Sequence, residues 1–198
     1  MRKSHLARKL SKVEDFENPK VKLEQYITPA SLAADLLHTA YMQGDIEGKK
    51  VVDLGAGTGI LSIGASLLNG KVTSIEKDEE AIKSLKKNRE TFGVEFSILN
   101  KDVESIELDS DTVVMNPPFS VHSELGMKFW QKAVETGSKV YAVSPHGKRS
   151  VIKDFVEKSG FRVVATEGYT VSLPPTFGFH TEASQEIEVD IIIAEQED

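Results

Sequence analysis

Short apolar segments alternate with amphipathic helical segments along most of this chain, and this alternation restricts the fold more than any other feature. Five short segments are typical of strands: 49–54, 71–76, 94–100, 111–116 and 139–144. Helical patterns precede, separate or follow them at 30–42, 60–68, 79–92, 125–136 and 151–160. The first strands are nearly all apolar, which is typical of a parallel sheet covered by helices on both faces. The sequence therefore predicts a doubly wound, mostly parallel α/β fold.

The two ends of the chain depart from this alternation. Two long predicted strands, 161–173 and 186–196, are joined by a loop instead of a helix, which predicts a C-terminal antiparallel hairpin. Residues 4–13 have the pattern of a short amphipathic helix. Thr28 followed by Pro29 predicts the N-cap and first position of the next helix.

The composition excludes several classes of function. The 198 residues include no cysteine, which excludes disulfides and thiolate chemistry and favours an intracellular, cytoplasmic location. The five histidines show no metal-ligand spacing, so we expect no metal site. No apolar run approaches the roughly 20 residues that span a bilayer.

The formal charge is unevenly distributed. A net charge of −7 argues against a general nucleic-acid binder. Residues 1–22, however, carry seven lysines and arginines against three acidic residues. This basic arm is either a solvated helix face or a contact for phosphates.

A glycine-rich turn follows the first predicted strand. In VVDLGAGTG, Gly55, Gly57 and Gly59 lie where the carboxyl edge of a parallel sheet binds ligands, and they allow the backbone to approach a ligand closely. Ile60 replaces the third glycine of the dinucleotide fingerprint, and no G-K-[ST] follows. NAD and nucleoside triphosphates are therefore not the predicted ligands.

Two acidic residues follow the next two predicted strands. Glu76 ends the second strand, where a carboxylate can accept both hydroxyls of an adenosine ribose, or cap a turn beside Asp78. Asp102 follows the third strand, where it can meet an adenine amine or serve as a turn residue. The glycine loop and Glu76 together indicate an adenosine-containing cofactor without phosphates.

The tetrapeptide NPPF, from Asn116 to Phe119, follows the apolar run DTVVM. Two consecutive prolines remove two backbone donors and fix φ, so the strand must end there. The four residues are either a rigid strand-ending turn or a rigid clamp for a flat, amine-bearing substrate.

Four motifs, DLGAGTG, SIEKD, NKDV and NPPF, resemble in order and spacing those of the class I S-adenosylmethionine-dependent methyltransferases. NPPF is similar to the amino-methyltransferases. Further stretches, LEQYITP, LSIGA, LPPTFGFH and IEVD, resemble the archaeal-type ribosomal-RNA adenine N6-methyltransferases of the methyltransferase-like-five kind. The similarity extends from about residue 23 to 193 and implies a seven-stranded Rossmann-like sheet.

The resemblance also implies S-adenosyl-L-methionine as cofactor and the N6 amine of an adenine in RNA, chiefly ribosomal RNA, as acceptor. We expect one methyltransferase domain over residues 1–198, with residues 1–45 as helical extension and cofactor lid and 46–198 as catalytic core. The implied or expected cofactor-binding residues are Gln25, Thr28, Asp53, Gly55, Gly57, Thr58, Ile60, Glu76, Asp102 and Val103. Animal members carry cysteines in the glycine loop, where this chain has Ala56 and Thr58, which leaves the backbone contacts intact.

In this reading NPPF has a chemical role. The Asn116 side-chain oxygen and the Pro117 carbonyl each accept one amine hydrogen, which turns the nitrogen lone pair toward the sulfonium methyl. Pro117 and Pro118 hold both acceptors rigid. Phe119 stacks on the base, and a target within structured RNA must be unpaired or flipped out.

Other residues are candidates for substrate contact. Tyr26 and Phe179 either shape the base pocket or pack in the core, and His180 is structural or positions the substrate. His146 and Lys148, in SPHGKR with Arg149, either contact phosphate or lie in a solvated turn.

The sequence leaves other functions open. An NPP-aromatic motif also serves protein glutamine N5-methyltransferases, although those enzymes usually carry tyrosine after the prolines and a longer N-terminal recognition domain. A non-catalytic cofactor-binding scaffold is disfavoured by the intact NPPF.

The third predicted strand suggests a partner. The class I arrangement makes 94–100 a sheet edge, and Phe96 and Ile98 give it apolar side chains with few charges. Related enzymes act with a small zinc-binding activator protein that adds a strand beside theirs. Alternatively, the strand is covered internally by the N-terminal helix.

Overall fold

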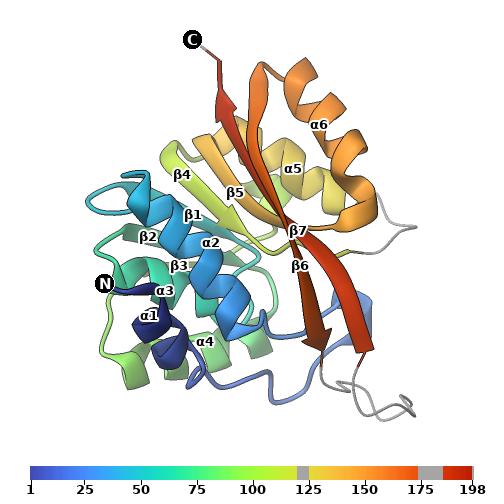
Figure 1. Cartoon of the computed structure of the whole chain (residues 1–198). Helices are drawn as coiled ribbons and strands as arrows, with labels where there is room; N and C mark the ends of the chain where they lie inside the picture. The colour runs from blue at the N-terminus through green and yellow to red at the C-terminus, as the bar shows by residue number, and fades with distance from the viewer. Residues whose placement is uncertain (120–124, 174–184, 198) are drawn as a thin grey trace.

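The computed structural model describes residues 1–119, 125–173 and 185–197 (Figure 1). Its strands are β1 (Lys50–Leu54), β2 (Lys71–Glu76), β3 (Ser97–Asn100), β4 (Ser110–Met115), β5 (Gly137–Pro145), β6 (Phe161–Leu173) and β7 (Gln185–Gln196). Its α-helices are α1 (Lys3–Leu10), α2 (Ala30–Met42), α3 (Ile60–Leu67), α4 (Glu79–Phe92), α5 (Leu125–Thr136) and α6 (Arg149–Lys158). Short 3₁₀ turns are η1 (Val21–Leu23), η2 (Val103–Ser105) and η3 (His146–Lys148).

The seven strands form one sheet in the order β3-β2-β1-β4-β5-β7-β6. The first five strands in chain order pair in parallel, whereas β7 pairs antiparallel with both β5 and β6. The predicted parallel sheet and C-terminal hairpin are therefore confirmed. The chain order reverses between β1 and β4, and at this point ligands bind in open α/β sheets.

Each face of the sheet carries its own apolar core. On one face, residues of α1, α2 and α3 pack with alternate side chains of the central strands, among them Tyr141 and Ile191. On the other face, α5 and α6 pack on the intervening side chains, with Trp130 almost fully buried. Figure 1 shows α2 and α5 on opposite sides of the strands. Among the described residues no helix is long and apolar enough to cross a membrane.

Local signals place most helix ends correctly. The Asp78 side chain caps α4 by accepting the Glu80 N–H, and Gly93 ends that helix with a φ of 59°. The predicted N-cap of α2, Thr28, was wrong by one residue. Pro29 is the N-cap and no side chain caps the helix, because the Thr28 hydroxyl has a partner elsewhere.

The third strand lies at the edge of the sheet, as expected. The N-terminal helix does not cover it, since α1 packs on α2 and α3. Phe96 is buried and Ile98 is half-buried against the apolar core, so these side chains face the protein interior. The free edge of the sheet therefore consists mainly of the backbone of β3.

One buried amide ties the segment after α1 to the glycine loop. Asn88 of α4 is 1% exposed. Its Oδ1 accepts the Glu14 N–H at 3.0 Å, and its Nδ2 donates to the Glu14 carbonyl at 2.9 Å and to the Thr58 carbonyl at 3.0 Å. All three of its amide hydrogen bonds are thus made across the tertiary structure.

We expect Asn88→Ala to lower the free energy of unfolding by about 2–3 kcal/mol, because it leaves buried backbone groups without partners. Urea denaturation measures this change. Gln131→Ala is the control, since the exposed Gln131 side chain hydrogen-bonds Glu135 one turn away on the same helix, and it should change stability by less than about 0.5 kcal/mol. A loss in Asn88→Ala no larger than that of the control would contradict the bridging role.

Candidate active site

A cleft lies at the carboxyl edge of the sheet, above β1, β2 and β4, where ligands bind in open α/β sheets. The predicted site residues that line it are Gln25, Tyr26, Thr28, Asp53, Gly55, Gly57, Thr58, Ile60, Glu76, Asp102, Val103, Asn116 and Pro118. The sequence did not single out several further lining residues, among them Phe16, Glu24, Lys77, Lys101 and Leu125.

The glycine loop after β1 adopts backbone conformations that favour glycine. Gly55 and Gly57 have φ angles of 71° and 54°, which residues with a side chain rarely adopt. A Cβ on Gly55 would lie 2.8 Å from the Phe129 ring, and one on Gly57 would lie 2.9 Å from the Phe16 ring. Phe129 is buried and also lines the cleft.

The Glu76 carboxylate joins this loop to the turn after β2. Its Oε2 accepts the Gly57 N–H at 2.8 Å and its Oε1 accepts the Asp78 N–H at 2.9 Å. Burial raises the pKa of Glu76, while these N–H donors oppose that shift. Each oxygen keeps a second lone pair, which leaves acceptor capacity for ligand hydroxyls.

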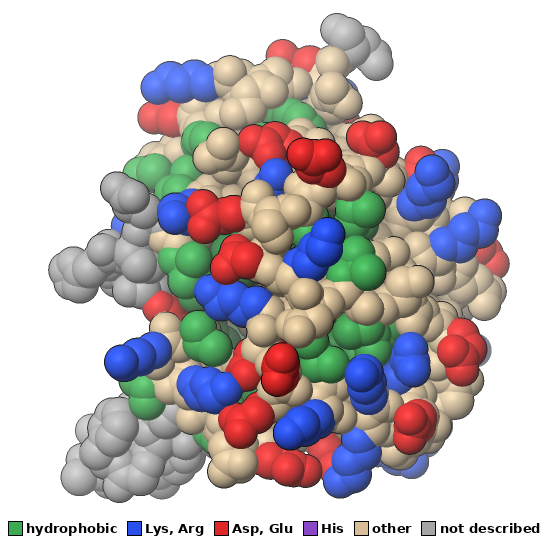
Figure 2. All heavy atoms as spheres, turned by 180° about the vertical axis from the view of Figure 1, so that it is seen from behind, with side chains coloured by type: hydrophobic (Ala, Val, Ile, Leu, Met, Phe, Trp, Pro, Cys, Tyr) green, Lys and Arg blue, Asp and Glu red, His purple; other side chains and the backbone are tan. Residues whose placement is uncertain are grey.

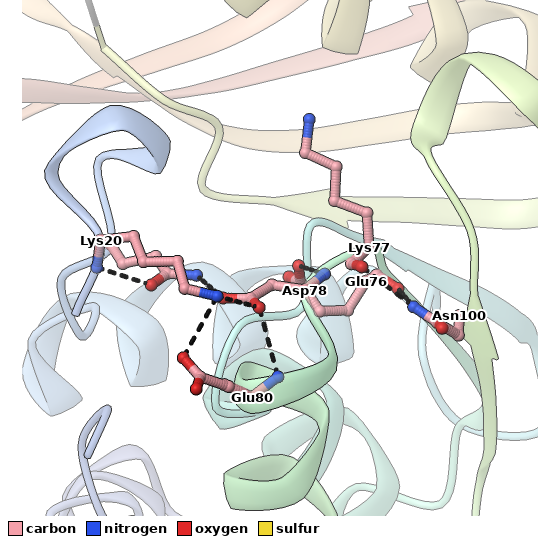
Figure 3. A network of polar contacts seen from close by, with 7 residues as sticks. Lys20, Glu76, Lys77, Asp78, Glu80 and Asn100 are labelled. Atoms are coloured by element: carbon pink, nitrogen blue, oxygen red, sulfur yellow. Dashed lines mark hydrogen bonds and ion pairs between the residues drawn. The ribbon is translucent and has the colours of Figure 1, made fainter. Parts of the chain in front are cut away.

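Gln25 lines the cleft and joins a polar network with Lys20 and Asp78. Figure 3 shows Lys20, Asp78 and Glu80 of this network. The Gln25 Oε1 accepts the Lys20 N–H at 2.8 Å, and its Nε2 donates to Asp78 Oδ2 at 2.6 Å. The Lys20 ammonium bridges Asp78 and Glu80 at 2.6 and 3.2 Å. Burial alone would raise the pKa of Asp78, but the hydrogen bonds from Lys20 and Gln25 lower it. Gln25 lines the cleft as expected, with both ends of its amide engaged in this network.

Asp53 carries an oxygen without a partner. It is 1% exposed, and its Oδ2 accepts the Ser62 hydroxyl at 2.5 Å. No described residue hydrogen-bonds its Oδ1. Burial raises the pKa of Asp53 to about 7; Ser62 opposes this shift and the Glu76 charge adds to it. A cationic or hydrogen-bond-donating ligand group would satisfy Oδ1.

Asp102 and Val103 close the cleft on the β3 side. Asp102 caps η2 by accepting the Glu104 N–H at 3.1 Å, and Lys77 lies 3.3 Å from its other oxygen. Burial would raise the pKa of Asp102, but these two contacts lower it, so the group is an anion. Val103 is buried beside it.

The NPPF loop meets the N-terminal segment across the cleft. Asn116 Nδ2 donates to the Thr28 hydroxyl at 2.8 Å, and no described residue hydrogen-bonds the buried Oδ1. The Phe119 N–H donates to the Glu24 carboxylate at 2.6 Å. The rings of Tyr26 and Phe119 lie 5.8 Å apart, tilted by 56°.

The prolines and Tyr26 complete this wall. Pro117 is buried and Pro118 lines the cleft. The Tyr26 hydroxyl is buried without a hydrogen-bond partner among the described residues. Burial, with the nearby Glu24 charge, raises the pKa of Tyr26, so its hydroxyl stays neutral and can donate.

His146 and Lys148, for which the sequence left a phosphate contact or a solvated turn open, lie at the turn η3 after β5. His146 Nδ1 and the Arg149 guanidinium are 3.1 and 2.8 Å from Asp190 Oδ1, and Asp190 is fully buried. Neither His146 nor Lys148 is among the residues that line the cleft. Phe179 and His180 lie outside the described residues.

The site can hold an adenosine-like ligand beside an acceptor for amine hydrogens. Two buried oxygens of cleft-lining residues, Asp53 Oδ1 and Asn116 Oδ1, have no partner among the described residues. These acceptors, together with the Glu76 carboxylate, fit a cofactor that carries an amino group and ribose hydroxyls. The described residues contain no cluster of three metal-binding side chains.

Known proteins are similar to this chain in sequence. The methyltransferase small domain family matches residues 31–157. The rRNA N(6)-adenosine-methyltransferase METTL5 of Danio rerio is 36% identical over 92% of this chain and 93% of its own, and Mettl5 of Drosophila melanogaster is 35% identical over 91% and 90%.

A solved structure is similar to this chain in both fold and sequence. A crystal structure of a candidate RNA methyltransferase from Pyrococcus horikoshii superposes with a TM-score of 0.94 at 40% identity, covering 100% of this chain and 99% of that one. The resemblance read from the motifs is thus confirmed. The chain belongs to the methyltransferase small domain family and, among S-adenosylmethionine-dependent methyltransferases, to the family of the METTL5 rRNA N(6)-adenosine-methyltransferases.

Proposed function

We propose that this protein transfers a methyl group from S-adenosylmethionine to the exocyclic N6 amine of an adenine in ribosomal RNA. The observation that carries the proposal is the Asn116 amide. Its nitrogen is held by Thr28, while its buried oxygen in the cleft wall has no partner among the described residues. A buried acceptor left without a donor is costly unless a ligand supplies one.

Asn116 acts on the orientation of the acceptor amine. The adenine N6 lone pair is delocalised into the ring, so the amine is a poor nucleophile. When Asn116 Oδ1 accepts one amine hydrogen, and the Pro117 carbonyl a second, the lone pair is aligned for transfer. Phe119 provides an aromatic surface for the base. No strong base is needed, because the proton can leave after transfer.

The cofactor-binding roles follow the same logic. S-adenosylmethionine, when bound, supplies a methyl group on a positively charged sulfur. Glu76 would accept the ribose hydroxyls, Asp53 would face the amino group, and Asp102 and Val103 would hold the adenine. The backbone of the glycine loop would lie against the cofactor, with Thr58 and Ile60 beside it. Residues 1–45 would form the lid.

RNA is favoured over a protein substrate because the similar METTL5 proteins are named as rRNA enzymes. On the face shown in Figure 2, acidic and basic side chains are interspersed, and no broad basic field covers it. RNA recognition there would depend on local contacts.

The deciding experiment is a labelled methyl-transfer assay that offers ribosomal subunits, bulk RNA, DNA and protein side by side. Label in N6-methyladenosine supports the proposal, and label in glutamine overturns it.

A partner and a location complete the proposal. The backbone edge of β3 would accept a strand from a small activator protein, which the resemblance alone suggests. A cytoplasmic location would suit a ribosomal-RNA substrate.

We expect Asn116→Ala to abolish most methyl transfer while cofactor affinity stays near wild type, because the amide acts on the acceptor amine. A loss of roughly 10²-fold in turnover is reasonable for a misplaced acceptor. Steady-state kinetics and calorimetry with S-adenosylhomocysteine separate the two effects. Near-normal turnover would refute the role of Asn116 as acceptor.

Glu76→Ala should weaken S-adenosylhomocysteine binding by about 1.5–3 kcal/mol, the range for hydrogen bonds to a charged group. Calorimetry gives the dissociation constant. Glu79→Ala is the matched control, because Glu79 is an exposed acid of the first turn of α4. Equal affinities in the two variants would contradict the assignment of Glu76.

The Asp53 carboxyl should make cofactor binding depend on pH. With a pKa of about 7 it is largely neutral at lower pH, and a cationic amino group binds its ionised form better. Affinity for S-adenosylhomocysteine should rise from about pH 5.5 to about pH 7.5. Asp53→Asn should flatten this rise, whereas Asp109→Asn, at an exposed acid, should not.

The free protein should show the opposite trend. The folded state holds the Asp53 proton more tightly than the unfolded chain, whose ordinary pKa is 3.8. The contribution of Asp53 to stability therefore falls as the pH rises from 3.8 toward 7. Urea denaturation across this range checks the sign, and a rise of the Asp53 contribution with pH would contradict it.

A further inference from the structure

Alternate residues of the segment 24–28 contact the NPPF loop. The Glu24 carboxylate holds the Phe119 N–H, the Tyr26 ring lies against the Phe119 ring, and the Thr28 hydroxyl holds Asn116 Nδ2. The segment has no regular secondary structure after η1. Its fit to the loop therefore depends on these three side chains.

The intervening residues have other partners. Gln25 joins Lys20 and Asp78, and Ile27 packs against the apolar core to which α2 contributes. The segment is thus anchored on one side to the protein body and on the other to the catalytic loop. Glu24 has a φ of 50°, an uncommon conformation for a residue other than glycine.

The contact of Thr28 with Asn116 selects one orientation of the amide. The two ends of a primary amide have nearly the same shape, but only the oxygen accepts hydrogens from an amine. In the structure the Thr28 hydroxyl accepts a hydrogen from Nδ2, which leaves Oδ1 in the cleft wall. The hydroxyl is used for this contact although it directly precedes the N-cap Pro29, and no side chain caps α2.

We propose that Thr28 is a positioning residue for methyl transfer, because its hydroxyl holds the Asn116 amide with the oxygen toward the acceptor amine. The proposal rests on the proposed function of that amide. If Thr28 contacted only the cofactor, its loss would weaken cofactor binding. Because its hydroxyl holds the Asn116 amide, its loss should instead lower turnover.

The test compares Thr28→Val, which removes the hydroxyl at constant shape, with Thr28→Ser, which keeps it. In Thr28→Val we expect turnover to fall by roughly 10²-fold, with little change in affinity for S-adenosylhomocysteine and in thermal stability. Thr28→Ser should recover most of that turnover. Thr91→Val is the control, because the Thr91 hydroxyl bonds only the Lys87 carbonyl within α4.

A second measurement reports the amide directly. The two side-chain N–H resonances of Asn116, observed by ¹⁵N NMR in the free protein, should shift and lose exchange protection in Thr28→Val but not in Thr28→Ser. In an Asn116→Ala background, Thr28→Val should cause no further loss of turnover, because both changes remove the same interaction.

The outcomes separate this proposal from the proposed function. Normal turnover of Thr28→Val, or a full additional loss in the Asn116→Ala background, overturns the positioning role. Unchanged Asn116 resonances in Thr28→Val also overturn it. If wild-type protein methylates no RNA while the resonances still depend on the Thr28 hydroxyl, the substrate assignment fails and the control of the amide stands.

Discussion

The buried carboxylate of Glu76 is the contact on which the ligand edge of the sheet depends. A charged group with little exposure is stable only if hydrogen bonds replace its lost hydration. Two backbone N–H groups do so, Gly57 from the glycine loop and Asp78 from the start of α4. The turns that follow β1 and β2 are thereby fixed relative to each other, and the floor of the cleft is formed.

From Asp78 the same network reaches the N-terminal segment. Lys20 and Gln25 both donate to this carboxylate, and three residues later Thr28 contacts Asn116. A segment without regular secondary structure therefore connects the cofactor side of the cleft with the catalytic loop. The segment is not a passive extension of the sheet, because it supplies contacts to both halves of the site.

The polar atoms left without partners among the described residues fall largely in one place. The interior of a protein normally pairs its buried donors and acceptors. Asp53 Oδ1, Asn116 Oδ1 and the Tyr26 hydroxyl all belong to residues that line the cleft. Such groups indicate where a ligand completes the hydrogen bonding, and violations of local rules are expected at functional sites. The raised pKa of Asp53 follows from the same burial.

The sequence by itself determined the parallel sheet, the C-terminal hairpin and the position of the glycine-rich turn, because those signals depend on neighbouring residues. Only the tertiary structure decided which side chains meet. Thr28 and Asn116 are 88 residues apart in the chain, and a local rule made Thr28 a helix cap. His146 likewise follows the carboxyl end of a strand, but its ring lies against Asp190 and not in the cleft. Local propensity fixes where a strand ends, whereas packing of the whole sheet fixes which ends share a cleft.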